Sequence, residues 1–195
     1  MPAGTRINEL QLAEELNLSR TPIRFALNEL ADEKLVQRIP GIGTEVVGID
    51  QADAREIFEI RKALDALATV MAMNHMSEEE FQELKDLLER GDVYHKNDQV
   101  VDLTESFSEF NEFIYEKAAM PRLKSIVHEL RTYLGYFRTM SIFAEERRTF
   151  ALQEHWMIYR GMVNRDEMQV RLIIDEHLEH SLTFILEEMN RLGID

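Results

Sequence analysis

The distribution of glycine and proline constrains the fold of this chain more than any other feature. Only eight glycines and four prolines occur in 195 residues, and two of each fall between Pro22 and Gly43. Because these residues are the strongest local breakers of regular structure, the rest of the chain has few obligatory turns. With 45% hydrophobic residues, the chain can also bury a core of ordinary size. We therefore expect a mainly α-helical protein.

Residues 7–31 predict two short helices joined by a tight turn. A run of apolar residues at helical spacing ends near Asn17, and Ser19 is suited to cap a second helix with Pro22 in its first turn. In that second helix, Arg20 and Arg24 lie four residues apart on a face away from the apolar positions. Those apolar positions are Ile23, Ala26, Leu27, Leu30 and Ala31.

The pattern changes after the second helix. The segment LVQRIPGIGTEVVGI has β-branched residues on both sides of a Pro-Gly-Ile-Gly turn, which predicts a two-stranded hairpin. We therefore expect a winged helix-turn-helix in residues 1–49. Residues 50–195 are expected to form an all-helical bundle of six amphipathic helices, near 51–74, 77–94, 97–117, 121–143, 145–163 and 166–191.

Charge and composition exclude several classes of protein. The net charge is −15, and residues 1–48 hold five basic and seven acidic residues, so any contact with DNA must be local rather than a general coating. The absence of cysteine excludes disulfides, thiolate metal sites and a cysteine nucleophile. No apolar run approaches the ~20 residues needed to span a bilayer. We expect a cytoplasmic protein without a membrane partner.

The two arginines of the second helix allow two interpretations. The first half of such a helix can enter the major groove, where Arg20 and Arg24 can contact guanine, while Ser19 and Thr21 add phosphate contacts. Gly43 would let the wing approach the DNA backbone closely. Alternatively, both arginines lie on a solvated face and pair with Glu29 or nearby carboxylates. Spacing alone does not decide between them.

Residues 5–47 resemble the winged-helix DNA-binding domain of the GntR family of bacterial transcription regulators. The similarity is carried by LAEELNLSRTPIRFALNELADEKLVQRIPGIGTEVV, above all by its Leu18–Arg24 segment and by Gly43 in the wing. The resemblance implies that Arg20 and Arg24 contact operator DNA and that a homodimer binds a palindromic operator. Members of the family usually have a further helix before the segment matching Pro2–Arg6, so the first helix is expected to be missing here.

The second part of the chain is similar to the all-helical FCD effector domain of the FadR subfamily. The segment EIFEIRKALDALA, the Glu154-His155 pair and the His177-Leu178 pair carry this resemblance. It implies a divalent metal such as zinc or nickel, held by an aspartate and three histidines. His155 and His177 match two of these ligands, but Phe107 and Asn111 stand at the aspartate and first-histidine positions. We therefore expect no more than a weakly held metal.

The same resemblance implies an effector pocket in the helical domain. We expect Asn111, His155 and His177 to contact a small organic effector, a carboxylate or an apolar metabolite, with Arg61 as a partner for an acidic group. The alternative for the histidines is a hydrogen-bonded pair in the core. The alternative for Arg61 is an ion pair with Asp65, four residues later on the same helix.

These patterns together predict a sequence-specific DNA-binding transcription regulator whose operator affinity is controlled by a small effector in the C-terminal domain. Two other functions remain as alternatives. One is a ligand-binding or dimerisation protein with impaired DNA binding, and the other is a metal-dependent enzyme built around His155 and His177. The chain shows no serine or lysine nucleophile beside a base. We therefore expect that it is not an enzyme.

Overall fold

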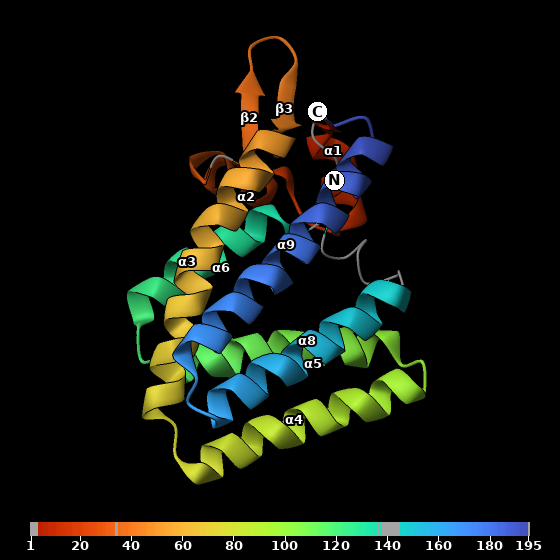
Figure 1. Cartoon of the computed structure of the whole chain (residues 1–195). Helices are drawn as coiled ribbons and strands as arrows, with labels where there is room; N and C mark the ends of the chain where they lie inside the picture. The colour runs from red at the N-terminus through yellow and green to blue at the C-terminus, as the bar shows by residue number, and fades with distance from the viewer. Residues whose placement is uncertain (1–3, 34, 136, 138–144, 195) are drawn as a thin grey trace. The chain divides into compact units, whose positions relative to one another are not determined.

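The structure is a computed structural model that describes residues 4–33, 35–135, 137 and 145–194. The chain divides into two compact units, an N-terminal unit of Met1–Asp50 and a helical unit of Gln51–Asp195. Figure 1 shows the elements of both units, coloured in chain order. The expected class, a mainly helical chain with a helix-turn-helix and a small sheet, is confirmed.

The N-terminal unit contains the expected helix, tight turn and second helix. Helix α1 (Glu9–Glu15) begins at Asn8, whose side chain accepts hydrogen bonds from two backbone amides of the first turn. The turn passes through Asn17, which adopts a left-handed backbone conformation with a φ of 52°. Helix α2 (Arg20–Asp32) then starts from Ser19 in extended backbone. Asparagine tolerates the left-handed region better than most residues, which explains the sharp change of direction.

A three-stranded antiparallel sheet completes this unit. Strands β2 (Val36–Ile39) and β3 (Gly43–Val46) form the expected hairpin, and β1 (Arg6–Ile7) pairs with the other edge of β3. Strand β1 was not expected from the sequence, because two residues are too few to show an alternating pattern. The small core between the helices is formed by Ala13, Ile23 and Leu27, with Ile7, Leu12 and Leu30 packed against it.

Six helices of the helical unit have bounds within the described residues. They are α3 (Gln51–His75), α4 (Glu78–Lys96), α5 (Val100–Lys117), α6 (Pro121–Tyr133), α8 (Glu145–Val163) and α9 (Glu167–Arg191). The two long helices α3 and α9 pack against each other, and α8 packs against α4 and α9. None of the helices in the described ranges is long and apolar enough to cross a membrane.

The ends of these helices follow local sequence signals. Ser77 and Glu80 form a capping box at the start of α4, and Asp166 caps α9 by accepting a hydrogen bond from the Gln169 amide. Most predicted helix boundaries lie within three residues of the observed ones. The local capping chemistry therefore explains why sequence reasoning found these breaks.

The prediction of one continuous helix over 121–143 was wrong at Leu134, where the helix is interrupted. Helix α6 ends at Tyr133, and Leu134 is its C-cap. Leu134 is a turn residue, whereas Gly135 and Phe137 are helical again. The apolar pattern continued past this point and concealed the break. The predicted residues 138–143 lie outside the part of the chain that the structure describes.

Candidate functional site

Helix α2 presents two arginine side chains to solvent. The side chains of Arg20 and Arg24 are 54% and 56% exposed, and both contact a single carboxylate oxygen on α1. Arg20 Nη2 lies 3.3 Å and Arg24 Nε 2.8 Å from Glu9 Oε2. Hydrogen bonds from Arg24 and Arg20 hold the pKa of Glu9 below its usual range. The shared carboxylate therefore fixes two guanidinium groups side by side and leaves most of their donors available.

The partner of these arginines differs from the one named by sequence reasoning. Glu29 or nearby carboxylates were suggested, and the observed partner is Glu9, on the preceding helix. Glu9 precedes Arg20 by 11 residues and Arg24 by 15, so no helical spacing could reveal the contact. The arginines thus have a carboxylate partner and also remain on an exposed surface.

The other residues predicted to contact DNA lie around the same helix and on the sheet. Ser19 and Thr21 are exposed at the start of α2, and Ser19 makes no capping hydrogen bond with its side chain. Gly43 begins β3 with a φ of 116°, a backbone conformation that side chains rarely adopt. A glycine is therefore required at this point of the hairpin for conformational reasons alone.

A cavity of about 90 Å³ lies inside the helical unit. All four residues predicted to contact an effector, Arg61, Asn111, His155 and His177, line its wall. They come from helices α3, α5, α8 and α9. The remaining described lining residues are Phe58, Thr104, Phe107, Arg131, Arg147, Arg148, Ala151, Leu178, Ser181 and Ile185.

Arg61 forms the ion pair with Asp65 that the sequence analysis gave as the alternative to effector binding. Its Nη2 lies 2.8 Å from Asp65 Oδ2, and Tyr115 donates its hydroxyl proton to the other oxygen of Asp65 at 2.8 Å. All three side chains are buried. Burial alone would lower the pKa of Arg61, but the Asp65 carboxylate beside it raises that pKa above its usual value. Arg61 is therefore a fixed positive charge in the cavity wall.

The residues at the position where the resemblance implies a metal do not suit a metal ion. His155 stacks on Phe110 with ring centroids 4.5 Å apart and meets the edge of Phe107 at 4.9 Å. Asn111 donates its side-chain N–H to the Phe107 carbonyl at 2.7 Å. No three histidine, aspartate or glutamate side chains within the described ranges are grouped so that they could hold a metal. A phenyl ring supplies no ligand, and an amide is a weak ligand for zinc or nickel.

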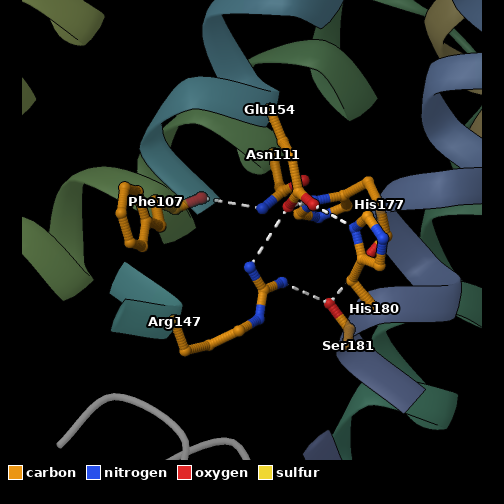
Figure 2. A network of polar contacts seen from close by, with 7 residues as sticks. All are labelled: Phe107, Asn111, Arg147, Glu154, His177, His180 and Ser181. Carbon is orange, nitrogen blue, oxygen red and sulfur yellow. Dashed lines mark hydrogen bonds and ion pairs between the residues drawn. The ribbon is translucent and has the colours of Figure 1, made fainter. Parts of the chain in front are cut away.

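Three side chains contact the Glu154 carboxylate, and Figure 2 shows this network together with Ser181. His177 Nδ1 and His180 Nδ1 each donate to one of its oxygens at 2.6 Å, and Arg147 Nη1 lies 3.1 Å from Oε2. Arg147 Nη2 also donates to Ser181 Oγ at 2.7 Å. Although burial would raise the pKa of Glu154, the hydrogen bond and charge of His177 lower it to about 2. Helices α8 and α9 are therefore joined by an ionised, multiply bonded carboxylate.

Sequence reasoning missed several members of this site. His180 was assigned no role, and Glu154 was considered only in relation to its chain neighbour His155, although it contacts His177 and His180 on α9. Arg131, Arg147 and Arg148 were also not expected in the cavity. One signal was present for Arg148, because it lies on the same helical stripe as Ala151 and His155, at spacings of three and seven.

Comparison with known proteins gives the same division of the chain. The family model of bacterial regulatory proteins of the gntR family matches residues 1–46, and the FCD domain model matches residues 56–180. YdhC of Bacillus subtilis, an uncharacterised HTH-type transcriptional regulator, is 25% identical over 95% of this chain and 84% of its own length. McbR of Escherichia coli, another HTH-type regulator, is 22% identical over 96% and 86%.

Solved structures show the same fold. The structure of E. coli McbR/YncC superimposes with a TM-score of 0.80, at 20% identity, over 96% of this chain and 90% of that chain. The metal-free FCD domain of TM0439 superimposes with a TM-score of 0.61, at 16% identity, over 74% of this chain and 99% of that chain. The matching families and relatives are DNA-binding transcription regulators and not enzymes. The chain belongs to the GntR family of bacterial transcription regulators, in the group that carries an FCD domain.

Proposed function

We propose that this protein is an effector-controlled operator-binding regulator in which α2 reads DNA and the cavity of the helical unit binds the effector. The observation that carries the proposal is the pair of exposed guanidinium groups of Arg20 and Arg24, fixed by Glu9 at the start of α2. In a helix-turn-helix this part of the second helix faces base edges in the major groove. Guanidinium groups can there contact guanine through two hydrogen bonds.

The surrounding residues support contacts with the DNA backbone. Ser19 and Thr21 are exposed beside the arginines and can donate their hydroxyls to phosphate oxygens. The hairpin at Gly43 carries no side chain that would keep the wing from the backbone. Because the protein as a whole has a net charge of −15, general attraction to DNA is weak and these few groups would decide where it binds.

We further propose that the regulator acts as a homodimer in the bacterial cytoplasm. Two copies of α2 would then occupy major grooves about one helical turn apart, and the operator would be palindromic. The helical unit would supply the dimer contacts and bind the effector through Arg61, Asn111, His155 and His177. Sedimentation of the protein with and without operator DNA would test the stoichiometry of two chains per palindrome.

The decisive experiment selects operators from a random DNA pool with the full-length protein and measures the affinity of arginine variants for them. Arg20→Ala and Arg24→Ala should each weaken operator binding roughly 5- to 150-fold, because each arginine contact with guanine contributes about 1–3 kcal/mol. Arg171→Ala is the matched control. Arg171 is also about half exposed and paired with a single carboxylate, Glu167, but lies on α9.

The control variant should bind the selected operator as the unaltered protein does. Measurements at several salt concentrations should show affinity falling as salt rises, with a smaller slope in the two arginine variants. Unchanged affinity and unchanged sequence preference in both Arg20→Ala and Arg24→Ala would rule out the proposed role of α2.

A further inference from the structure

We propose that the cavity of the helical unit binds a small organic or inorganic oxyanion directly through its arginine side chains, without a metal ion. The proposal rests on the proposed function in one respect, that this cavity is the effector site. It goes further by naming the chemistry of the ligand and the groups that hold it.

The first observation is the charge of the cavity wall. Four arginines, Arg61, Arg131, Arg147 and Arg148, line the cavity together with two histidines. No aspartate or glutamate is among the lining residues that the structure describes. A space lined by several guanidinium groups and no carboxylate favours a negatively charged occupant, because buried charge is costly unless it is paired.

The second observation is that nearby carboxylates do not neutralise this wall. Glu154 is shared between Arg147 and two histidines, and Arg148 contacts Asp98, whose side chain is 85% exposed. Arg131 has no carboxylate within ion-pair distance among the described residues, and its guanidinium lies 5.9 Å from the centre of the Tyr115 ring. Positive charge therefore remains in excess on the cavity side.

The third observation is an unused hydrogen-bond donor. Arg61 is only 7% exposed, and its Nε has no hydrogen-bond partner within the described ranges. A buried donor without a partner costs about 1–3 kcal/mol, so such groups are rare unless a ligand or water completes them. An oxygen of a bound anion would satisfy this donor, since Arg61 lines the cavity.

The fourth observation is the chemistry of the position where the resemblance implies a metal. Phe107 and Asn111 stand where the resemblance implies a carboxylate and an imidazole, and the ring of His155 stacks on Phe110 and meets the edge of Phe107. These residues do not suit a cation that could hold an anion at that point. Guanidinium groups can hold an anion directly, because their planar fork of donors matches carboxylate and phosphate oxygens.

The size and walls of the cavity limit the ligand. By the same measure of volume a water molecule needs about 10–15 Å³, so a cavity of about 90 Å³ accommodates roughly six to nine non-hydrogen atoms. Apolar side chains, among them Phe58 and Ile185, also line the cavity. Both a short dicarboxylate and a phosphate meet these limits, and they share the chemistry of closely spaced negatively charged oxygens.

The experiment is calorimetric titration of the full-length protein in EDTA, at constant ionic strength. The probes are succinate, inorganic phosphate and the neutral analogue succinamide. Saturable binding of succinate or phosphate in EDTA, at one ligand per chain and without binding of succinamide, is the expected result. Binding of succinate alone identifies a carboxylate site, and binding of phosphate alone identifies a phosphate site.

Three variants test the named arginine. Arg131→Gln should weaken binding of the preferred anion by about 10-fold or more, because a hydrogen bond to a charged group contributes about 1.5–3 kcal/mol. Arg131→Lys should retain intermediate affinity, since it keeps the charge and loses the fork. The control Arg122→Gln removes an exposed arginine from the start of the same helix and should change nothing. Circular dichroism and a thermal melt verify that each variant is folded.

Several outcomes would overturn the proposal. They are saturable binding of neither anion, equal binding of succinate and succinamide, binding that requires added zinc or nickel, and equal effects of Arg131→Gln and Arg122→Gln. None of these affects operator binding by α2, which is measured without ligand. Failure of the anion site is thus distinguishable from failure of the proposed function.

Discussion

Arginine side chains are held in opposite ways in the two units of this protein. Arg20 and Arg24 are more than half exposed and share a single carboxylate, whereas Arg61 and Arg148 are each only 7% exposed. An exposed ion pair contributes little to stability and leaves donors available for an external partner. A buried guanidinium must be paired at all times, since an uncompensated charge in the interior is strongly destabilising. Arginine thus suits a temporary contact with an external partner in the N-terminal unit and a permanent buried ion pair in the helical unit.

The largest expected effect comes from breaking a buried pair. Asp65→Ala should lower the free energy of unfolding of the helical unit by about 3–5 kcal/mol, because it leaves Arg61 charged and buried and removes the acceptor of Tyr115. Urea unfolding followed by fluorescence of Trp156, the single tryptophan of the chain, reports on this unit.

The control for this change lies on the same helix. Glu56→Ala removes an exposed carboxylate from α3 and should alter stability by less than about 0.5 kcal/mol. If Asp65→Ala destabilised the unit no more than Glu56→Ala does, the buried arginine would not depend on its carboxylate, and the comparison between the two units would fail.

An intermediate effect is expected at Glu154, and it depends on pH. The pKa of Glu154 is lowered to about 2 from an ordinary value of 4.5. A carboxyl group with a lowered pKa stabilises the fold above the unfolded value and loses that contribution as pH falls toward the folded value. The contribution should therefore be complete above pH 4.5 and disappear towards pH 2, and its size is on the order of 2–3 kcal/mol.

Glu154→Gln should remove this pH-dependent part of the stability. Unfolding free energies from Trp156 fluorescence, measured between pH 6 and pH 2.5, would show a smaller loss in the variant than in the unaltered protein. Glu187→Gln is the control, because it removes an exposed carboxylate from α9. Equal pH dependence in the unaltered protein and Glu154→Gln would contradict the role assigned to this carboxylate.

The smallest effect is expected at the exposed pair. Glu9→Gln should change the stability of the N-terminal unit by less than about 1 kcal/mol, because exposed ion pairs are screened by solvent. Hydrogen exchange of the α1 and α2 amides measures the opening free energy of this unit. A loss as large as that of Asp65→Ala would show that Glu9 is a structural clamp, and would remove the contrast with the helical unit.

Local signals explain how much of the fold could be predicted. The helix-turn-helix, the hairpin and most helix ends depend on capping residues, turn formers and apolar spacing, all of which are legible over a few neighbouring residues. Strand β1 and the end of α6 were not found. The strand owes its existence to pairing with β3, some 37 residues later, and the apolar pattern of α6 continues through Leu134.

The candidate sites were less predictable for a different reason. The resemblance to a family identified Arg61, Asn111, His155 and His177, and all four line one cavity. Buried arginines such as Arg148 have the same appearance in a sequence as solvated ones, since arginine is far more often exposed. The contact of Glu154 with α9 depends on how two helices are rotated against each other, which spacing within one helix does not encode.

Helix α3 runs from the start of the helical unit to the cavity, because it begins at Gln51 and carries Arg61. Arg61 lies ten residues after Gln51, where α3 and the helical unit begin, a distance of roughly 15 Å along the helix axis. A ligand that contacts both Arg61 of α3 and Arg131 of α6 would connect these two helices. Because a continuous helix transmits displacement with little bending, the position of the first turn of α3 would change when the ligand binds.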